Sequence, residues 1–216
     1  MYQNVIFDLD GTLLNTLEDL KDSTNYALAR HGYPTRTLEE VRCFVGNGIR
    51  KLIDRAVPEG TSVEKTDKVF ATFREYYATH SRVKTSMYEG MEQVMDALKE
   101  QNISMAIVSN KADDAVKDLA KYYFAKYIDV AIGEREGISR KPAPDSVYEA
   151  MRLLGATKEN TVYVGDSDVD RATAKNAGIP CISVTWGFRS EELLVSLEPE
   201  YLIHKPEEIL SVVTGK

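Results

Sequence analysis

Residues 5–14 have the sequence VIFDLDGTLL, an apolar run that ends in two aspartates and a glycine. Consecutive apolar residues bounded by polar ones are typical of a buried strand, and the glycine indicates a tight turn. Alternate residues of an extended chain share a face, so Asp8 and Asp10 point the same way. The stretch therefore predicts a buried strand that delivers two carboxylates to one side of a loop.

Short β-like runs alternate with helical runs along most of the remaining chain. Further strands are expected at 103–108, 128–132, 161–164, 181–184 and 201–203, and helices at 113–123, from 144 onward and at 168–177. Such alternation is typical of a mostly parallel sheet that is covered by helices on both faces. We therefore predict the α/β fold class, with a doubly wound, Rossmann-like core.

One block of sequence interrupts this alternation. Between residues 16 and 84 there is helical periodicity and no good strand, and Val69, Phe70, Phe73, Tyr76 and Tyr77 recur at spacings of three and four. That spacing is the apolar stripe of an amphipathic helix, and packing is its simplest explanation. We expect a small all-helical domain at 16–84, inserted after the first strand, and a core formed by residues 1–15 and 85–216.

Composition and charge exclude several classes of function. The chain has 216 residues and a net charge of −7, which argues against a nucleic-acid surface or a polybasic membrane patch. No apolar run approaches the roughly 18 residues of a membrane span, and the acidic start MYQNVIFDLD does not resemble a signal peptide. Cys43 and Cys181 form no CxxC pattern. We expect a soluble cytoplasmic protein that needs no nucleic acid, membrane or obligate protein partner.

Four polar clusters follow four of the expected strands. They are DLDGT at 8–12, Ser109-Asn110, Lys141-Pro142 and GDSDVD at 165–170. In open α/β sheets, ligands bind outside the carboxyl ends of the strands. Clusters far apart in the sequence can therefore converge on one site, although Ser109-Asn110 taken alone could simply cap the next helix.

The residue types in these clusters suit phosphoryl transfer. Asp8, Asp10 and Asp166 offer the hard oxygen ligands that Mg²⁺ prefers, and a carboxylate can also act as a nucleophile toward phosphorus. Phosphoryl transfer needs mainly positioning and neutralisation of charge. The groups that could position the phosphoryl group and neutralise its charge are the flexible backbone of Gly11, the hydroxyl of Ser109 and the ammonium group of Lys141.

The stretches VIFDLDGTLL, IVSN, RKPAPD and VYVGDSDVD resemble, in order, the four motifs of the haloacid dehalogenase superfamily of phosphatases. This resemblance implies that Asp8 is the nucleophile and that Asp10 is the general acid and then the general base. It implies that Ser109 and Lys141 hold the phosphoryl group, and that the first and fourth strands are neighbours. Mg²⁺ would be bound by Asp8, Asp166 and the backbone carbonyl of Asp10, with Asp170 as an auxiliary acidic residue.

The helical insert is similar to the cap of the subfamily that contains phosphoglycolate phosphatase, on the stretches FVGNGIRKLI and YYATHS. The insert has twelve Lys and Arg against ten Asp and Glu, whereas the rest of the chain is acidic, which would suit a lid for a small anionic substrate. The substrate-binding candidates are Gly11, Thr12, Asn110, Gly46, Asn47, Gly48 and Arg50. Lys51 or His80 could also contact substrate.

Together these features predict a Mg²⁺-dependent phosphomonoester hydrolase that acts on a small anionic phosphorylated metabolite through an aspartyl phosphate. Phosphoglycolate is the first substrate to test. A pyrophosphatase, a sugar-phosphate phosphatase and a phosphomutase of the same superfamily remain alternatives. A receiver-type phosphoaspartate module is a more distant one, because it expects adjacent acids at the first site and has no helical insert.

Overall fold

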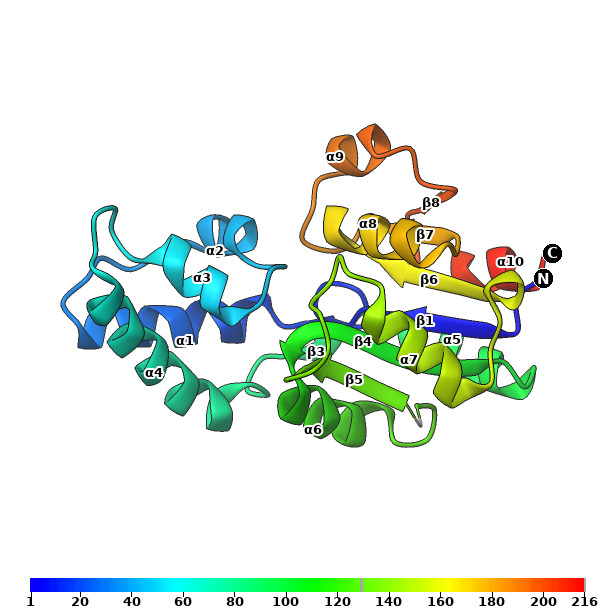
Figure 1. The fold of residues 1–216 in the computed structure, drawn as a ribbon, viewed down its shortest axis with the longest axis horizontal. Helices are drawn as coiled ribbons and strands as arrows, with labels where there is room; N and C mark the ends of the chain where they lie inside the picture. The colour runs from blue at the N-terminus through cyan, green and yellow to red at the C-terminus, as the bar shows by residue number, and fades with distance from the viewer. Residues whose placement is uncertain (129, 216) are drawn as a thin grey trace. The chain divides into compact units, whose positions relative to one another are not determined.

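Six strands form one parallel sheet in the order β5-β4-β1-β6-β7-β8 (Figure 1). The computed structural model describes residues 1–128 and 130–215. The strands are β1 (Asn4–Phe7), β4 (Ser104–Ala112), β5 (Val130–Glu134), β6 (Thr161–Gly165), β7 (Cys181–Val184) and β8 (Tyr201–Ile203). The six predicted strands are thus present, although β4 runs four residues further than expected. Position 129 of the predicted strand at 128–132 lies outside the described residues.

Helices cover both faces of this sheet. They are α5 (Met91–Glu100), α6 (Asp113–Phe124), α7 (Asp145–Leu154), α8 (Asp168–Ala177), α9 (Glu191–Ser196) and α10 (Glu208–Thr214), with a 3₁₀ turn, η1, at Lys158–Asn160. Val5 and Phe7 of β1 share a buried cluster with residues of α5, α6 and α10. Ile6, which points the other way, shares a second cluster with residues of α7 and α8. The predicted doubly wound α/β fold is confirmed.

The central strand β1 brings the polar clusters together. It pairs in parallel with β4 on one side and with β6 on the other, so that Phe7 lies beside both Ile107 and Val164. The expected adjacency of the first and fourth predicted strands is therefore confirmed. The segments that follow β1, β4 and β6 leave the sheet at neighbouring points of its carboxyl edge.

The chain divides into two compact units. Unit 1 comprises Met1–Leu14 and Met87–Lys216, and unit 2 comprises Asn15–Ser86. Unit 2 contains the helices α1 (Leu17–Arg30), α2 (Leu38–Phe44), α3 (Ile49–Ala56) and α4 (Val63–His80). Where the chain passes between the units, β2 (Leu14–Asn15) and β3 (Ser86–Met87) form a two-stranded sheet. Strands of two residues carry no periodicity, so the sequence did not reveal them.

The aromatic stripe of α4 is used for packing within unit 2. Val69, Phe73 and Tyr77 are buried there. The ring of Tyr76 stacks on Tyr26 at a centroid distance of 3.9 Å and on His80 at 3.7 Å.

Among the helices of the described residues, none is long and apolar enough to cross a membrane.

Candidate active site

The loop after β1 brings its two aspartates to the carboxyl edge of the sheet. The backbone N–H of Asp8 donates to Val164 O at 2.9 Å, which continues the pairing with β6. Gly11 has a φ of +89°, a conformation that favours glycine. A Cβ at Gly11 would lie 2.5 Å from Oδ2 of Asp166. Glycine is therefore required both by the turn and by the close approach of the loop to Asp166.

The end of β4 carries Ser109, Asn110 and Lys111, and its pairing with β5 is irregular between Val108 and Ala112. The side chain of Asn110 accepts from the backbone N–H of Lys141 at 2.9 Å and donates to Lys141 O at 3.1 Å. Among the described residues, no side chain caps the start of α6, so the capping role considered for Ser109-Asn110 is wrong. Asn110 instead holds the segment that carries Lys141.

Lys141 lies at the centre of a buried ionic cluster. Its Nζ is 2.9 Å from Asp8 Oδ1, 2.7 Å from Asp170 Oδ1 and 2.9 Å from the hydroxyl oxygen of Tyr163. Burial alone would lower the pKa of Lys141, but the charges of Asp170 and Asp8 outweigh it and raise that pKa. The ammonium group is therefore charged at neutral pH and faces the predicted nucleophile.

Asp170 holds Lys141 in place. Its Oδ1 accepts from Lys141 and, at 3.0 Å, from the hydroxyl of Tyr163, while its Oδ2 accepts from the Ser167 N–H at 3.1 Å and the Ser167 hydroxyl at 2.5 Å. A Cβ at Gly165 would lie 2.3 Å from the Cβ of Asp170. Both oxygens of Asp170 are engaged, and its auxiliary role in the reaction stays a prediction.

Two hydrogen bonds orient the carboxylate of Asp166. Its Oδ1 accepts from the hydroxyl of Thr12 at 3.3 Å, and its Oδ2 accepts from the backbone N–H of Phe188 at 2.7 Å. Burial, with the charges of Asp170 and Asp8, raises the pKa of Asp166 to about 8. Burial and Asp170 likewise raise the pKa of Asp8 to about 7, against the opposing effect of Lys141. A positive charge placed near either carboxylate would therefore stabilise its ionised form.

The acidic cluster can hold a metal ion. One carboxylate oxygen from each of Asp8, Asp166 and Asp170 lies within 4.8 Å of the others. Among the described residues, no donor meets hydrogen-bond geometry at the buried Oδ1 of Asp8, although Lys141 is close. With Asp10 included, four carboxylates face two ammonium groups, so the ionised cluster has two negative charges in excess. One divalent cation with a preference for oxygen ligands would neutralise them.

Lys111 is a site residue that the sequence did not identify. Its Nζ lies 3.0 Å from Oδ1 and 3.1 Å from Oδ2 of Asp10, and its side chain is only 4% exposed. The apolar pattern of the strand ends at Val108, so Lys111 was assigned to no element. Lys111 lies where the pairing of β4 with β5 is irregular, so simple strand alternation does not place its side chain.

The predicted substrate contacts of the insert lie in unit 2. Gly48 precedes α3 with a φ of +81°, and the side chain of Asn47 accepts from Arg55 at 2.9 Å. Arg50 pairs with Asp54 at 2.8 Å and with Asp67. Gly46 has a φ of +107°. A contact between substrate and any of these residues, Lys51 or His80 stays a prediction.

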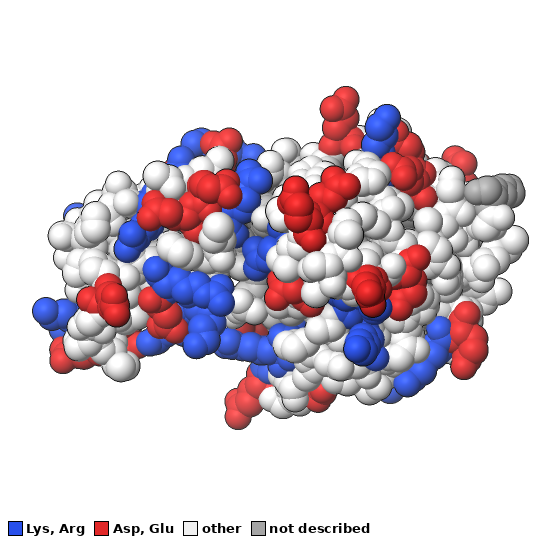
Figure 2. Space-filling view, turned by 90° about the horizontal axis from the view of Figure 1, so that it is seen from above, with Lys and Arg blue, Asp and Glu red and all other residues white. Residues whose placement is uncertain are grey.

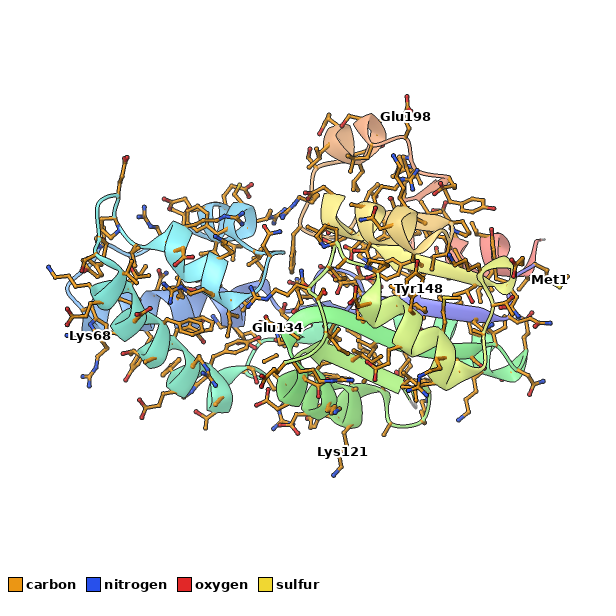
Figure 3. The ribbon with its side chains drawn as sticks, in the orientation of Figure 1. Met1, Lys68, Lys121, Glu134, Tyr148 and Glu198 are labelled. Atoms are coloured by element: carbon orange, nitrogen blue, oxygen red, sulfur yellow. The ribbon has the colours of Figure 1, made fainter. Side chains whose placement is uncertain are left out.

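Other charges of unit 1 are paired near its surface. Figure 3 labels Glu134 at the end of β5, where it pairs with Arg140. Asp168, the first residue of α8, is exposed and pairs with Arg189 at 3.2 Å. Figure 2 shows acidic and basic side chains interspersed on the face in view. These surface pairs contrast with the four carboxylates and two lysines gathered at the strand ends.

Comparison with known proteins agrees with this arrangement. The family model described as haloacid dehalogenase-like hydrolase matches residues 5–184. Phosphoglycolate phosphatase 1 of Pseudomonas aeruginosa is 32% identical over 95% of this chain and 78% of its own length. The pyrophosphatase PpaX of Halalkalibacterium halodurans is 30% identical over 98% of this chain and 97% of its own. A crystal structure of a protein from Lactobacillus delbrueckii superposes with a TM-score of 0.94 at 32% identity, covering 100% of this chain and 99% of that one.

The doubly wound fold carries its cluster of carboxylates and lysines at the carboxyl edge of the sheet, where ligands bind in this class of α/β protein. The chain belongs to the haloacid dehalogenase-like hydrolase family, since the family model covers most of its length. The predictions that the chain is an enzyme and a member of this superfamily of phosphatases are confirmed.

Proposed function

We propose that this phosphatase is a Mg²⁺-dependent phosphomonoester hydrolase that forms an aspartyl phosphate on Asp8 and acts on a small anionic metabolite. The observation that supports this most strongly is the position of Asp8, with Lys141 2.9 Å from one oxygen and Asp166 in the same acidic cluster. A carboxylate beside a buried ammonium group can approach a phosphate dianion, because Lys141 offsets part of the repulsion between the two negative groups.

In the proposed reaction the Asp8 carboxylate attacks phosphorus, and the bond between phosphorus and the ester oxygen breaks. Asp10 gives its proton to the departing oxygen and then takes a proton from the water that attacks the aspartyl phosphate. The second step releases inorganic phosphate and restores Asp8. Lys141 neutralises charge on the phosphoryl oxygens, and Asp170 and Tyr163 keep its ammonium group in position.

Mg²⁺, bound by Asp8, Asp166 and the backbone carbonyl of Asp10, would screen the repulsion between the nucleophile and the phosphoryl oxygens. Ser109, near the end of β4, would donate its hydroxyl to a phosphoryl oxygen. Gly11 would let the loop backbone approach the phosphoryl group. Thr12 and Asn110 support this arrangement by binding Asp166 and the Lys141 backbone respectively.

Two substrates merit testing first. Relatives named for phosphoglycolate and for pyrophosphate hydrolysis are similarly close, at 32% and 30% identity. Both substrates are small anions with a phosphoryl group, which suits a site that neutralises charge with Lys141. We assign the choice of substrate to unit 2, with Gly46, Asn47, Gly48 and Arg50 as the candidate residues.

The test is phosphate release from phosphoglycolate, pyrophosphate and sugar phosphates, with Mg²⁺ and with EDTA. The Asp8→Asn variant should lose at least about a thousandfold in kcat, because the nucleophile is removed. Asp118→Asn is the matched control, since Asp118 is exposed on α6 and lies outside the acidic cluster. Substantial turnover by Asp8→Asn would contradict the mechanism. Phosphate transfer to a second hydroxyl of the substrate, without release, would indicate a mutase.

A further inference from the structure

The loop after β7 contacts the acidic cluster, although its residues take no part in the proposed chemistry. We call residues 185–189, with the sequence TWGFR, the β7 loop. Gly165 at the end of β6 pairs with Ser183 of β7, so the β7 loop begins beside the segment that carries Asp166.

Two neighbouring residues of the β7 loop, Gly187 and Phe188, lie directly against the side chain of Asp166. The backbone N–H of Phe188 donates to Asp166 Oδ2 at 2.7 Å. A Cβ at Gly187 would lie 2.2 Å from the Cβ of Asp166 and 2.4 Å from its Oδ2. No real Cβ occupies such positions, so any residue other than glycine would force Asp166 or the β7 loop to move.

Trp186 ties the β7 loop to the loop after β1. Its indole N–H donates to Thr12 O at 3.1 Å, and the hydroxyl of Thr12 donates to Asp166 Oδ1 at 3.3 Å. The contacts thus form a closed ring that runs from Asp166 through Thr12 and Trp186 to Phe188 and back. The aromatic ring of Tyr88 lies near that of Trp186, at a centroid distance of 6.4 Å.

These contacts fix the direction of the Asp166 carboxylate. A carboxylate has about four lone-pair positions, and the Thr12 hydroxyl and Phe188 N–H occupy one on each oxygen. The remaining positions are available to a cation in the cluster with Asp8. A ligand that is already oriented loses less entropy on binding, and removal of such supporting contacts typically weakens metal binding about 10- to 100-fold.

We propose that the β7 loop is the positioning element of the metal site, and that Gly187 and Trp186 set the affinity of the protein for its divalent cation by orienting Asp166. The proposal rests on the proposed function, because it takes Asp166 to be a ligand of Mg²⁺. It assigns a role to two residues that lie outside the four motifs and beyond residue 184, where the match to the family model ends. Gly187 and Trp186 act through Asp166 and do not themselves touch the cation.

The experiment compares Mg²⁺ binding to the metal-free wild type and to Gly187→Ala by isothermal titration calorimetry. We expect the dissociation constant of Gly187→Ala to rise about 10- to 100-fold. At Mg²⁺ concentrations that saturate the variant, kcat should return to within a few-fold of wild type, because the chemical groups are unchanged. Trp186 is the only tryptophan of the chain, so its fluorescence provides a second titration signal.

Trp186→Phe and Phe188→Leu complete the comparison. Trp186→Phe keeps an aromatic ring but loses the donor to Thr12, and should raise the dissociation constant by a smaller factor. Phe188→Leu alters a buried side chain of the same loop but keeps the backbone N–H that binds Asp166, so it should bind Mg²⁺ like wild type. Melting in EDTA checks that each variant is folded, and Trp186→Phe carries the test if Gly187→Ala does not fold.

The outcomes separate this inference from the proposed function. Equal affinity for Mg²⁺ in wild type, Gly187→Ala and Trp186→Phe would overturn the role of the β7 loop and leave the phosphatase mechanism intact. An equal loss of affinity in Phe188→Leu would also overturn it, because general disturbance of the loop would then explain the effect. A wild type that binds no Mg²⁺, with turnover unaffected by EDTA, would instead overturn the proposed function.

Discussion

The charged cluster at the strand ends of unit 1 and the ion pairs of Arg50 in unit 2 contain the same chemical groups but differ in burial. At the strand ends of unit 1, the side chains of Lys141 and Asp170 are 3% and 0% exposed. In unit 2, the side chains of Arg50 and Asp67 are 34% and 53% exposed. Burial, and not residue type, distinguishes the candidate active site from an ordinary charged surface.

This difference determines how much each ion pair matters. Removing one partner of a buried pair leaves an uncompensated charge and typically costs about 3–5 kcal/mol, whereas an exposed pair contributes about 0–1 kcal/mol. The buried site therefore needs a complete set of partners, and Lys141 has three.

The largest effect outside the nucleophile is expected for Lys141→Met. The substitution leaves Asp8 and Asp170 buried without their shared ammonium group, so the free energy of unfolding should fall by about 3–5 kcal/mol. Turnover should fall at least about a thousandfold, because charge on the phosphoryl group is no longer neutralised. Denaturant unfolding and steady-state kinetics measure the two effects. A stable, active Lys141→Met variant would show that burial does not make this pair essential.

A smaller effect is expected for Lys111→Met, because the side chain of Asp10 is partly exposed, at 21%. Loss of the ion pair should misplace the predicted general acid and lower kcat about tenfold with little change in KM. The loss should be greater for an alkyl phosphate than for p-nitrophenyl phosphate, whose departing oxygen needs little help from an acid. Lys111→Arg is the matched control. An equal loss with both esters would indicate a purely structural role.

The raised pKa values of the acidic cluster predict a pH-dependent stability. The pKa of Asp8 is raised from 3.8 to about 7 and that of Asp166 from 3.8 to about 8, mainly by burial. Between about pH 4 and pH 8 the folded protein therefore binds more protons than the unfolded chain, so rising pH lowers the stability of the metal-free protein.

The Tm in EDTA should accordingly fall by several degrees from pH 5 to pH 8. Mg²⁺ binds the ionised carboxylates, so the Tm gained on adding Mg²⁺ should be larger at pH 8 than at pH 6. Thermal melts of wild type and Asp8→Asn measure this, and the variant should show a shallower slope because one of the two groups no longer titrates. Identical slopes in the two proteins would rule out Asp8 as a source of the effect.

The smallest effect on stability is expected for Arg50→Gln in unit 2. Its pairs with Asp54 and Asp67 are exposed, so the free energy of unfolding should change by less than about 1 kcal/mol. If Arg50 contacts an anionic substrate, KM should nevertheless rise for phosphoglycolate and pyrophosphate while kcat changes little. Lys68→Gln is the control, because Lys68 also forms an exposed ion pair in unit 2, with Glu64, and is not a candidate for substrate binding. An unchanged KM with both substrates would remove Arg50 from the substrate site.

The sequence alone predicted the sheet and most of the site, because apolar runs of strand length were each followed by polar residues. Parallel strands end at one edge, so Asp8, Ser109, Lys141 and Asp166 could be assigned to one place before their distances were known. The end of β4 was predicted too early. Its apolar pattern stops at Val108, whereas its pairing with β5 extends to Ala112 opposite Glu134.

The partners of these residues were decided only by the tertiary structure. Lys111 is 101 positions from Asp10, and the hydroxyl of Tyr163 lies on a strand that otherwise resembles apolar core. The β7 loop has no pattern that indicates Asp166. Local sequence indicates which segments form strands, because propensity and periodicity act over a few residues. Which buried charges meet depends on the order of strands in the sheet and on the need of each buried group for a partner.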